Sequence, residues 1–564
     1  MNKKSITFLI IIFIIVFYPL AIPWYIFALD QTFPYIYTNW PEFGANNYWL
    51  NTIGLWFTHL WISTWILEKL TYIMMFSVIG YFSYRLVSRC RYDISKIFTI
   101  LFLFMNPFFY GRFIEWQINV YLSYAFFIMF FYFVIEYFKY KQYQYWVHIS
   151  LTSLLLCLTS IHNIFIIALI LLVFWLIYSI PNYRDKKFWK YAWLLGVWII
   201  IFNSLWILPT IQREDLTNQI QSFWDNHRIA FESPGGIYDN VYLSVLSGKW
   251  YWWEWQWRFT PSEIHNEYYF FIFLVLLLLI LKWLSLGLKS KESRALSISL
   301  LILGILSYVL ALWISGNNIF TGFNIYLFDT VPFYSGFREP HKWVLVIIMI
   351  YAYFWAHAVD NIYLVIRSKK SLQSFKNSFI LFCVFLPIIY TPAMLFGSWG
   401  QIDPKFYPKG WQDLKNNIQI PEAIECNPEI TSKCYHTLIL PWHGYINVWW
   451  TNKPIVISWI FRYFWTDVLY GDTIEIANVY TQSQRKESKI IEKYVPHLDS
   501  ASSVLDDSTI DNFLNDMQSL WIRNILVVNE SDVASYENII DSLVESQNIS
   551  IIIENTYGTL YRIK

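Results

Sequence analysis

The stretch that decides the fold is "MNKKSITFLIIIFIIVFYPLAIPWYIFAL", residues 1–29. It begins like a secretory signal, with Lys3 and Lys4 ahead of a long apolar run. The run is longer than the apolar region of a signal peptide, and no small-x-small cleavage site follows it. The stretch therefore predicts an uncleaved first membrane span.

The composition of the whole chain supports the same class of protein. Of 564 residues, 56% are apolar and 21% aromatic, whereas only 14% are charged. So large an apolar excess cannot be buried in one soluble core of ordinary surface-to-volume ratio. The formal net charge of +1 argues against nucleic acid as a partner. We expect an α-helical integral membrane protein.

Apolar runs along the chain predict the number of spans. A hydrocarbon core of about 30 Å needs roughly 20 apolar residues per helix. On that measure we expect about eleven transmembrane helices. They lie near 5–28, 68–87, 95–109, 118–138, 144–160, 163–180, 191–210, 267–287, 295–315, 343–366 and 378–397.

The positions of basic residues predict the orientation. With the N-terminus in the cytoplasm, every inside loop is basic, as the positive-inside rule requires. These loops carry Arg85, Arg89, Arg91 and Lys96; Lys139 and Lys141; Arg184, Lys186, Lys187 and Lys190; Lys289, Lys291 and Arg294; and Arg367, Lys369, Lys370 and Lys376. The outer regions are then 29–67, 110–117, 211–266 and 316–342. We expect a multi-pass protein of the cell (plasma) membrane, with a transmembrane domain over 1–397 and an extracytoplasmic domain over 398–564.

The exported tail alternates β-rich and helical segments. "YHTLILPW" and "NILVV" predict strands, "SYENIIDSLVESQ" predicts a helix, and "ISIIIEN" with "GTLYRIK" predicts a closing hairpin. The tail is therefore expected to be a soluble α/β domain. Cys426 and Cys434 lie within it in "CNPEITSKC". A local disulfide fits an oxidising compartment, and free thiols are the alternative.

Several ionisable residues fall in the predicted outer regions. Asp30 directly follows the first span and could act as a general base, or simply end a helix in water. "NPFFYGRFIEWQINVYLSY" places Arg112 and Gln117 in an outer turn where they could bind substrate. His162, in "SIHNIF", is either a site residue or an interfacial hydrogen-bonding group.

Aromatic residues mark a second feature of the outer regions. In "GKWYWWEWQWRF", residues 248–259, Trp253 and Trp255 share one face if the chain is extended. Such a face could stack on sugar rings, but tryptophan also settles at the headgroup level of a membrane. Both interpretations stay open.

The polar stretch "FREPHKW", residues 337–343, precedes the tenth predicted span. Because Pro340 breaks the chain, Arg338, His341 and Lys342 are expected to gather at the outer end of that helix, with Glu339 beside them. Arginine and lysine suit phosphate oxygens, so a phosphate-binding role is predicted. The alternative is that these cations only mark the membrane interface.

Two motifs carry a resemblance to a known superfamily. "DTVPFYSGFREPHKWVLVIIMIYAYFWAHAVD", residues 329–360, resembles the late signature of GT-C-type membrane glycosyltransferases, including the YfhO-like and arabinofuranosyltransferase-like families. "NPFFYGRFIEWQ", residues 106–117, is similar to the Asn-Pro-Phe turn of the same families, although Trp116 stands where glycine is expected. The resemblance implies a GT-C-like helical bundle.

The resemblance also implies an activity. Such a protein transfers a sugar from a polyprenyl-phosphate donor to an envelope glycan, lipid or protein acceptor on the outer face. Asp30 would be the catalytic base, and Arg338, His341 and Lys342 would bind the donor phosphate. No cofactor or metal-ligand cluster is predicted, although some members use a divalent metal. The alternatives are a non-catalytic membrane scaffold and a protein that binds or transports lipid-linked sugars.

Overall fold

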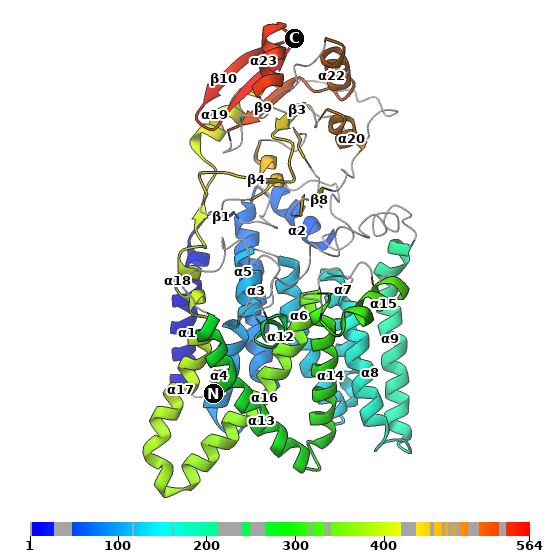
Figure 1. Ribbon diagram of the computed structural model, residues 1–564, viewed down its shortest axis with the longest axis vertical. Helices are drawn as coiled ribbons and strands as arrows, with labels where there is room; N and C mark the ends of the chain where they lie inside the picture. The colour runs from blue at the N-terminus through cyan, green and yellow to red at the C-terminus, as the bar shows by residue number, and fades with distance from the viewer. Residues whose placement is uncertain are drawn as a thin grey trace. The chain divides into compact units, whose positions relative to one another are not determined.

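A computed structural model gives the arrangement of the chain (Figure 1). It describes residues 3–27, 48–115, 118–160, 162–211, 240–248, 266–314, 318–331, 334, 340–418, 436–451, 456–464, 468–471, 475–476, 479–480, 486–494, 507–529 and 537–564. Clustering of contacts divides the chain into two compact units. Unit 1 comprises the described residues of 1–18, 42–48 and 70–399, and unit 2 those of 19–41, 49–69 and 400–564.

Long apolar helices dominate the described residues, and nine of them are long and apolar enough to cross a membrane. The chain is therefore a multi-pass membrane protein. The nine are α1 (Lys3–Phe17) with η1 (Tyr18–Ala21), α3 (Thr64–Leu86), α4 (Asp93–Phe104) with α5 (Pro107–Glu115), α6 (Ile118–Phe138), α9 (Lys186–Ile211), α13 (Asn266–Lys289), α14 (Arg294–Leu312), α16 (Val344–Ser368), and η9 (Lys370–Phe375) with α17 (Lys376–Tyr390).

The other two predicted spans fall on shorter helices. These are α7 (Trp146–Thr159) and α8 (Asn163–Ser179), with 14 and 17 residues. At 1.5 Å per residue they are about 21 Å and 26 Å long, less than a typical hydrocarbon core. The count of eleven spans therefore stays a prediction.

Contacts at their ends show that α7 and α8 form a helical hairpin. At one end, Lys141 before α7 binds Asn182 after α8, with Nζ 3.0 Å from Oδ1. At the other end, the turn between the two helices places His162 against Lys342, just before α16. The predicted crossing of the membrane by these two helices stays a prediction. Which end faces the cytoplasm stays a prediction.

Residues 110–115, part of the outer turn predicted over 110–117, are helical in the structure. Helix α4 ends at Phe104, and the Asn106 side chain accepts a hydrogen bond from the backbone N–H of Phe109, which starts α5 (2.9 Å). After this interruption a second helix runs from Pro107 through Glu115, where an exposed turn is predicted. Apolar packing explains why: Phe113 of α5 contacts Phe17 and Tyr121, with ring centroids 5.5 Å and 5.7 Å away.

Unit 2 contains the predicted tail together with part of the first outer region. The strand β1 (Tyr25–Ile26) pairs antiparallel with β2 (Pro404–Lys405). Tyr407 lies next to it and packs its ring against Phe27, with centroids 5.1 Å apart. Helix α2 (Tyr48–His59) and the start of α3 belong to the same unit, whose boundary crosses α3 between Lys69 and Leu70. The compact unit is therefore larger than a tail cut at residue 398.

The predicted strands and hairpin of the tail are confirmed as parts of one five-stranded sheet. Its order is β10-β11-β9-β3-β6, with β3 parallel to both β6 and β9 and the other pairs antiparallel. The strands are β3 (Thr437–Leu440), β6 (Val468–Leu469), β9 (Asn524–Val528), β10 (Ile549–Asn555) and β11 (Gly558–Ile563). The predicted helix is α23 (Glu537–Glu545), and α22 (Asp507–Ser519) precedes β9.

Short elements complete the described parts of the chain. In unit 1 they are η3 (Tyr143–Tyr145), α12 (Val241–Leu246), α15 (Thr321–Thr330), η8 (Pro340–Trp343), η10 (Pro392–Met394) and α18 (Leu395–Trp399). In unit 2 they are α19 (Lys409–Asn417), β4 (Tyr445–Ile446), β5 (Val456–Ile457), η11 (Ser458–Tyr463), β7 (Glu475–Ile476), β8 (Val479–Tyr480) and α20 (Lys486–Glu492).

Candidate functional site

Two of the predicted site residues meet in unit 1, although they are 180 residues apart in sequence. Lys342, in η8, places its Nζ 3.4 Å from Nδ1 of His162. The Ser160 hydroxyl lies 3.4 Å from the same nitrogen. Because a lysine ammonium can only donate, Nδ1 acts as the acceptor and the ring proton lies on Nε2. A lysine and an imidazole thus meet at this end of the bundle.

The structure places Arg112 differently from the prediction. Its side chain is buried inside α5, with the guanidinium carbon 5.9 Å from the ring centroid of Phe108. Its carbonyl accepts a hydrogen bond from the Tyr121 hydroxyl. The predicted exposed substrate-binding turn is therefore a buried helix, because Asn106 restarts the helix before the arginine is reached.

The remaining predicted site residues cannot be placed. Those outside the described residues are Asp30, Gln117, Trp253, Trp255, Arg338 and Glu339. The backbone of His341 belongs to η8, but its side chain is also outside them. Cys426 and Cys434 lie there too. Among the residues that are described, no group of three or more His, Cys, Asp or Glu could hold a metal ion. A divalent metal therefore stays an untested prediction.

Unit 2 contains a buried charged pair that the sequence analysis missed. Glu68 and Lys69 lie near the start of α3, and their side chains are 0% and 9% exposed. A Glu68 carboxylate oxygen accepts a hydrogen bond from the backbone N–H of Ile26 (3.3 Å). At the first residue of α3, the Thr64 hydroxyl lies 2.9 Å from the Tyr25 hydroxyl. The sequence does contain a signal for this pair: two adjacent charged residues lie inside a candidate span, where transferring a charge into the membrane is unfavourable.

The Lys69 ammonium is poorly satisfied in this site. Its Nζ is 3.9 Å from Oε2 of Glu68, too far for a hydrogen bond. Across the described part of the chain, Nζ has no hydrogen-bond partner at all. Burying an ammonium group without hydrogen bonds has a desolvation free energy of roughly several kcal/mol, even when an opposite charge lies nearby. The arrangement would be completed by an anionic group that brings acceptor oxygens to Nζ.

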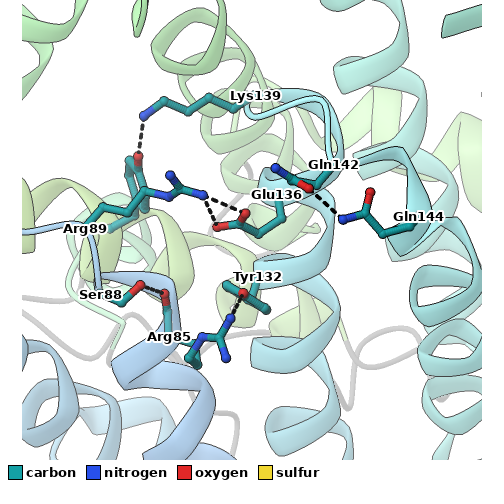
Figure 2. Close-up of polar contacts among 9 residues, drawn as sticks. Arg85, Ser88, Arg89, Tyr132, Glu136, Lys139, Gln142 and Gln144 are labelled. Atoms are coloured by element: carbon teal, nitrogen blue, oxygen red, sulfur yellow. Dashed lines mark hydrogen bonds and ion pairs between the residues drawn. The ribbon is translucent and has the colours of Figure 1, made fainter. Parts of the chain in front are cut away.

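The opposite end of α3 shows what a satisfied charged cluster looks like in this protein. Figure 2 shows Arg89 pointing at Glu136 of α6, with Nη2 2.9 Å and 3.2 Å from the two carboxylate oxygens. Arg85 donates to the hydroxyls of Tyr81 and Tyr132 at 2.9 Å and 2.6 Å. Lys139 donates to the Tyr353 hydroxyl at 3.2 Å. Each cation in the cluster reaches at least one oxygen.

Helix α16 reinforces this cluster from its own side. The Asp360 carboxylate accepts hydrogen bonds from the backbone N–H groups of Arg91 and Tyr92 (3.2 Å and 2.9 Å) and from the Ser95 hydroxyl (3.1 Å). It therefore caps the start of α4 from a different helix. Burial raises the pKa of the nearby Cys90 thiol, which stays protonated and unreactive. We infer a structural role for this end of the bundle.

A comparison with known protein families finds a match over part of the chain. A family described as a 6-pyruvoyl-tetrahydropterin synthase related domain, membrane protein, matches residues 62–233. The matched segment includes the Glu68–Lys69 pair, Arg112 and His162. No curated protein matches the chain. The match supports a membrane protein and names no glycosyltransferase.

Proposed function

We propose that the protein is a membrane glycosyltransferase that takes a sugar from a polyprenyl-phosphate donor. The observation that supports it most is Lys69, a buried ammonium beside a buried carboxylate, with no hydrogen-bond partner among the described residues. Lys69 lies five residues into α3, so it sits about 8 Å along the helix from Thr64. That depth suits a phosphate attached to a lipid chain.

Such a transfer needs a cation beside the donor phosphate, where the bond between the sugar and the phosphate oxygen breaks. The acceptor hydroxyl oxygen bonds to the anomeric carbon of the sugar, and the bond from that carbon to the phosphate oxygen breaks. The hydroxyl proton goes to a carboxylate, and polyprenyl phosphate leaves with the additional negative charge. A fixed ammonium stabilises this developing charge. We assign the cation to Lys69, and Asp30 and Glu68 are the candidate bases.

The second cationic group supports the same proposal. Lys342 and His162 lie together at the end of unit 1 that is predicted to face outward, where Arg338 and His341 are also expected. They suit the donor phosphate or the acceptor. At the opposite end, the Arg89–Glu136 and Lys139–Tyr353 contacts hold neighbouring helices together.

Binding of polyprenyl phosphate to the purified full chain tests the proposal directly. Lys69→Met should weaken binding roughly 100-fold, since one charged hydrogen-bonding contact to a phosphate is lost. The matched control is Lys96→Met: Lys96 is 11% exposed and lies 3.8 Å from Asp93, at the other end of the bundle. It should bind normally. Polyprenol without phosphate should bind both proteins equally weakly.

Two results would overturn the proposal. Equal loss of affinity in both lysine variants would show a general effect of removing a buried charge. Unchanged binding by Lys69→Met, together with full loss of function on deleting residues 398–564, would favour the membrane scaffold instead. Transfer assays with Asp30→Asn and Glu68→Gln then identify the base, because only the variant that lacks the base should bind donor and fail to transfer.

A further inference from the structure

An exposed apolar surface lies on α2, directly ahead of the α3 span. Ile53, Trp56 and Leu60 are spaced by three and four residues, so they share one helical face. Their exposed fractions are 40%, 67% and 62%, and that of Trp61 is 95%. We call these four residues the α2 apolar face. Water is a poor environment for two indoles and two branched aliphatic side chains in a row.

The end of α2 holds Trp61 in a backbone conformation that usually belongs to glycine. The N–H of Ile62 bonds to the carbonyl of Phe57 (2.9 Å), and that of Trp61 bonds to the carbonyl of Thr58 (3.1 Å). This is the Schellman pattern, which places Trp61 at the left-handed position with φ 56°. A bulky residue there is strained, whereas glycine is not. The sequence thus keeps a strained tryptophan and turns it fully outward.

The composition of residues 48–67 and the position of α3 indicate that the lipid bilayer covers the α2 apolar face. Residues 48–67 contain no Asp, Glu, Lys or Arg, so none of these charges opposes transfer of the segment from water to the membrane interface. Only two residues separate Trp61 from Thr64, where the candidate span α3 begins. The α2 apolar face must therefore lie within one or two helical turns of the bilayer surface. Tryptophan is also the side chain that prefers the headgroup level.

We propose that the α2 apolar face docks unit 2 onto the lipid bilayer, with Trp56 and Trp61 inserted at the headgroup level. The occupant is the lipid surface itself, because the face continues directly into a membrane span. A second copy of the chain is the other possible occupant, and the test below separates the two. This inference does not rest on the proposed sugar transfer. It concerns how the first outer region, and with it unit 2, is held at the membrane.

The docking can be measured by depth-dependent quenching in liposomes of phosphatidylcholine and phosphatidylglycerol. The full chain, with its five cysteines replaced, would carry an environment-sensitive fluorophore at Trp56→Cys or Trp61→Cys. The control is Ile551→Cys in β10 of the same unit, whose side chain is 54% exposed. We expect quenching by brominated lipid at 56 and 61, and several-fold weaker quenching there by aqueous iodide than at 551.

Two outcomes would overturn the inference. Iodide quenching at 56 and 61 that equals the quenching at 551 would show that the face stays in water. Protection from both quenchers, together with cross-linking between two copies through residue 61, would show that a second chain covers it. If either tryptophan variant fails to fold, Ile53→Cys and Leu60→Cys report on the same face.

Discussion

The two ends of helix α3 carry charged residues in very different states. At its last turn and the following loop, Arg85 and Arg89 reach phenol and carboxylate oxygens at hydrogen-bonding distance. Near its first turn, Lys69 is 3.9 Å from Glu68 and bonds to nothing among the described residues. The charged side chains at the last turn of α3 and in the following loop have hydrogen-bond partners, whereas the Lys69 ammonium near its start has none among the described residues. The two ends therefore form two different kinds of site. The first holds the bundle together, and the second suits a ligand.

The largest expected effect concerns the satisfied end. Arg89→Met should lower the free energy of unfolding by about 2 kcal/mol, because it leaves the Glu136 carboxylate, 9% exposed, without the guanidinium, which is itself 50% exposed. Thermal unfolding of the purified protein measures the change. Arg91→Met is the control, since that side chain lies exposed in the same loop. Equal melting temperatures for the two variants would contradict a structural role for the Arg89–Glu136 pair.

A smaller effect is expected from the cap on α4. Asp360→Ala removes three hydrogen bonds at the start of that helix, which should cost about 1–2 kcal/mol. Hydrogen exchange should accelerate in peptides covering the first turn of α4, and donor binding should not change. Asp360→Asn keeps one acceptor oxygen and should show a partial effect. A loss of donor affinity without faster exchange would place ligand binding at this end.

The third prediction tests the ligand-binding end of unit 1. His162→Ala should weaken polyprenyl-phosphate binding roughly tenfold, equivalent to about 1.4 kcal/mol, because it removes the partner that positions Lys342. His148→Ala is the control at the opposite end of α7, where the side chain is exposed. If His148→Ala weakens binding as much as His162→Ala does, the assignment of the ligand to the His162 end fails.

The smallest expected effect is a pH dependence at the satisfied end. Burial, with the nearby Arg89 guanidinium, lowers the pKa of Lys139 to about 8. The unfolded chain, with its ordinary lysine pKa, binds more protons than the folded one from about pH 8 to about pH 10, so stability should rise with pH in that window. The difference in melting temperature between wild type and Lys139→Met should change by about 2 °C over it. A flat difference would mean that Lys139 titrates like an exposed lysine.

Local sequence was sufficient for the membrane class and for the strands of the tail. Apolar runs and basic loops act through transfer free energies that depend on residue type and not on distant partners. "NILVV" and "GTLYRIK" are also predicted correctly, because their β-rich residue pattern favours a strand locally. The same local reasoning failed at residues 110–115, where the predicted outer turn is helix. Helix α4 does end before Pro107, but the Asn106 side chain then starts a new helix where a turn is predicted, and aromatic packing holds it.

The candidate sites depended on contacts that no sequence pattern contains. His162 and Lys342 were each predicted on chemical grounds, but only the fold brings them to 3.4 Å across 180 residues. Glu68 and Lys69 were adjacent in the sequence and still overlooked, because their significance lies in burial and in the hydrogen bond from Ile26. The sequence by itself determined that this chain enters a membrane, since hydrophobicity is a sum over residues. The tertiary structure decided which charges are satisfied, since hydrogen bonding depends on the positions of specific atoms.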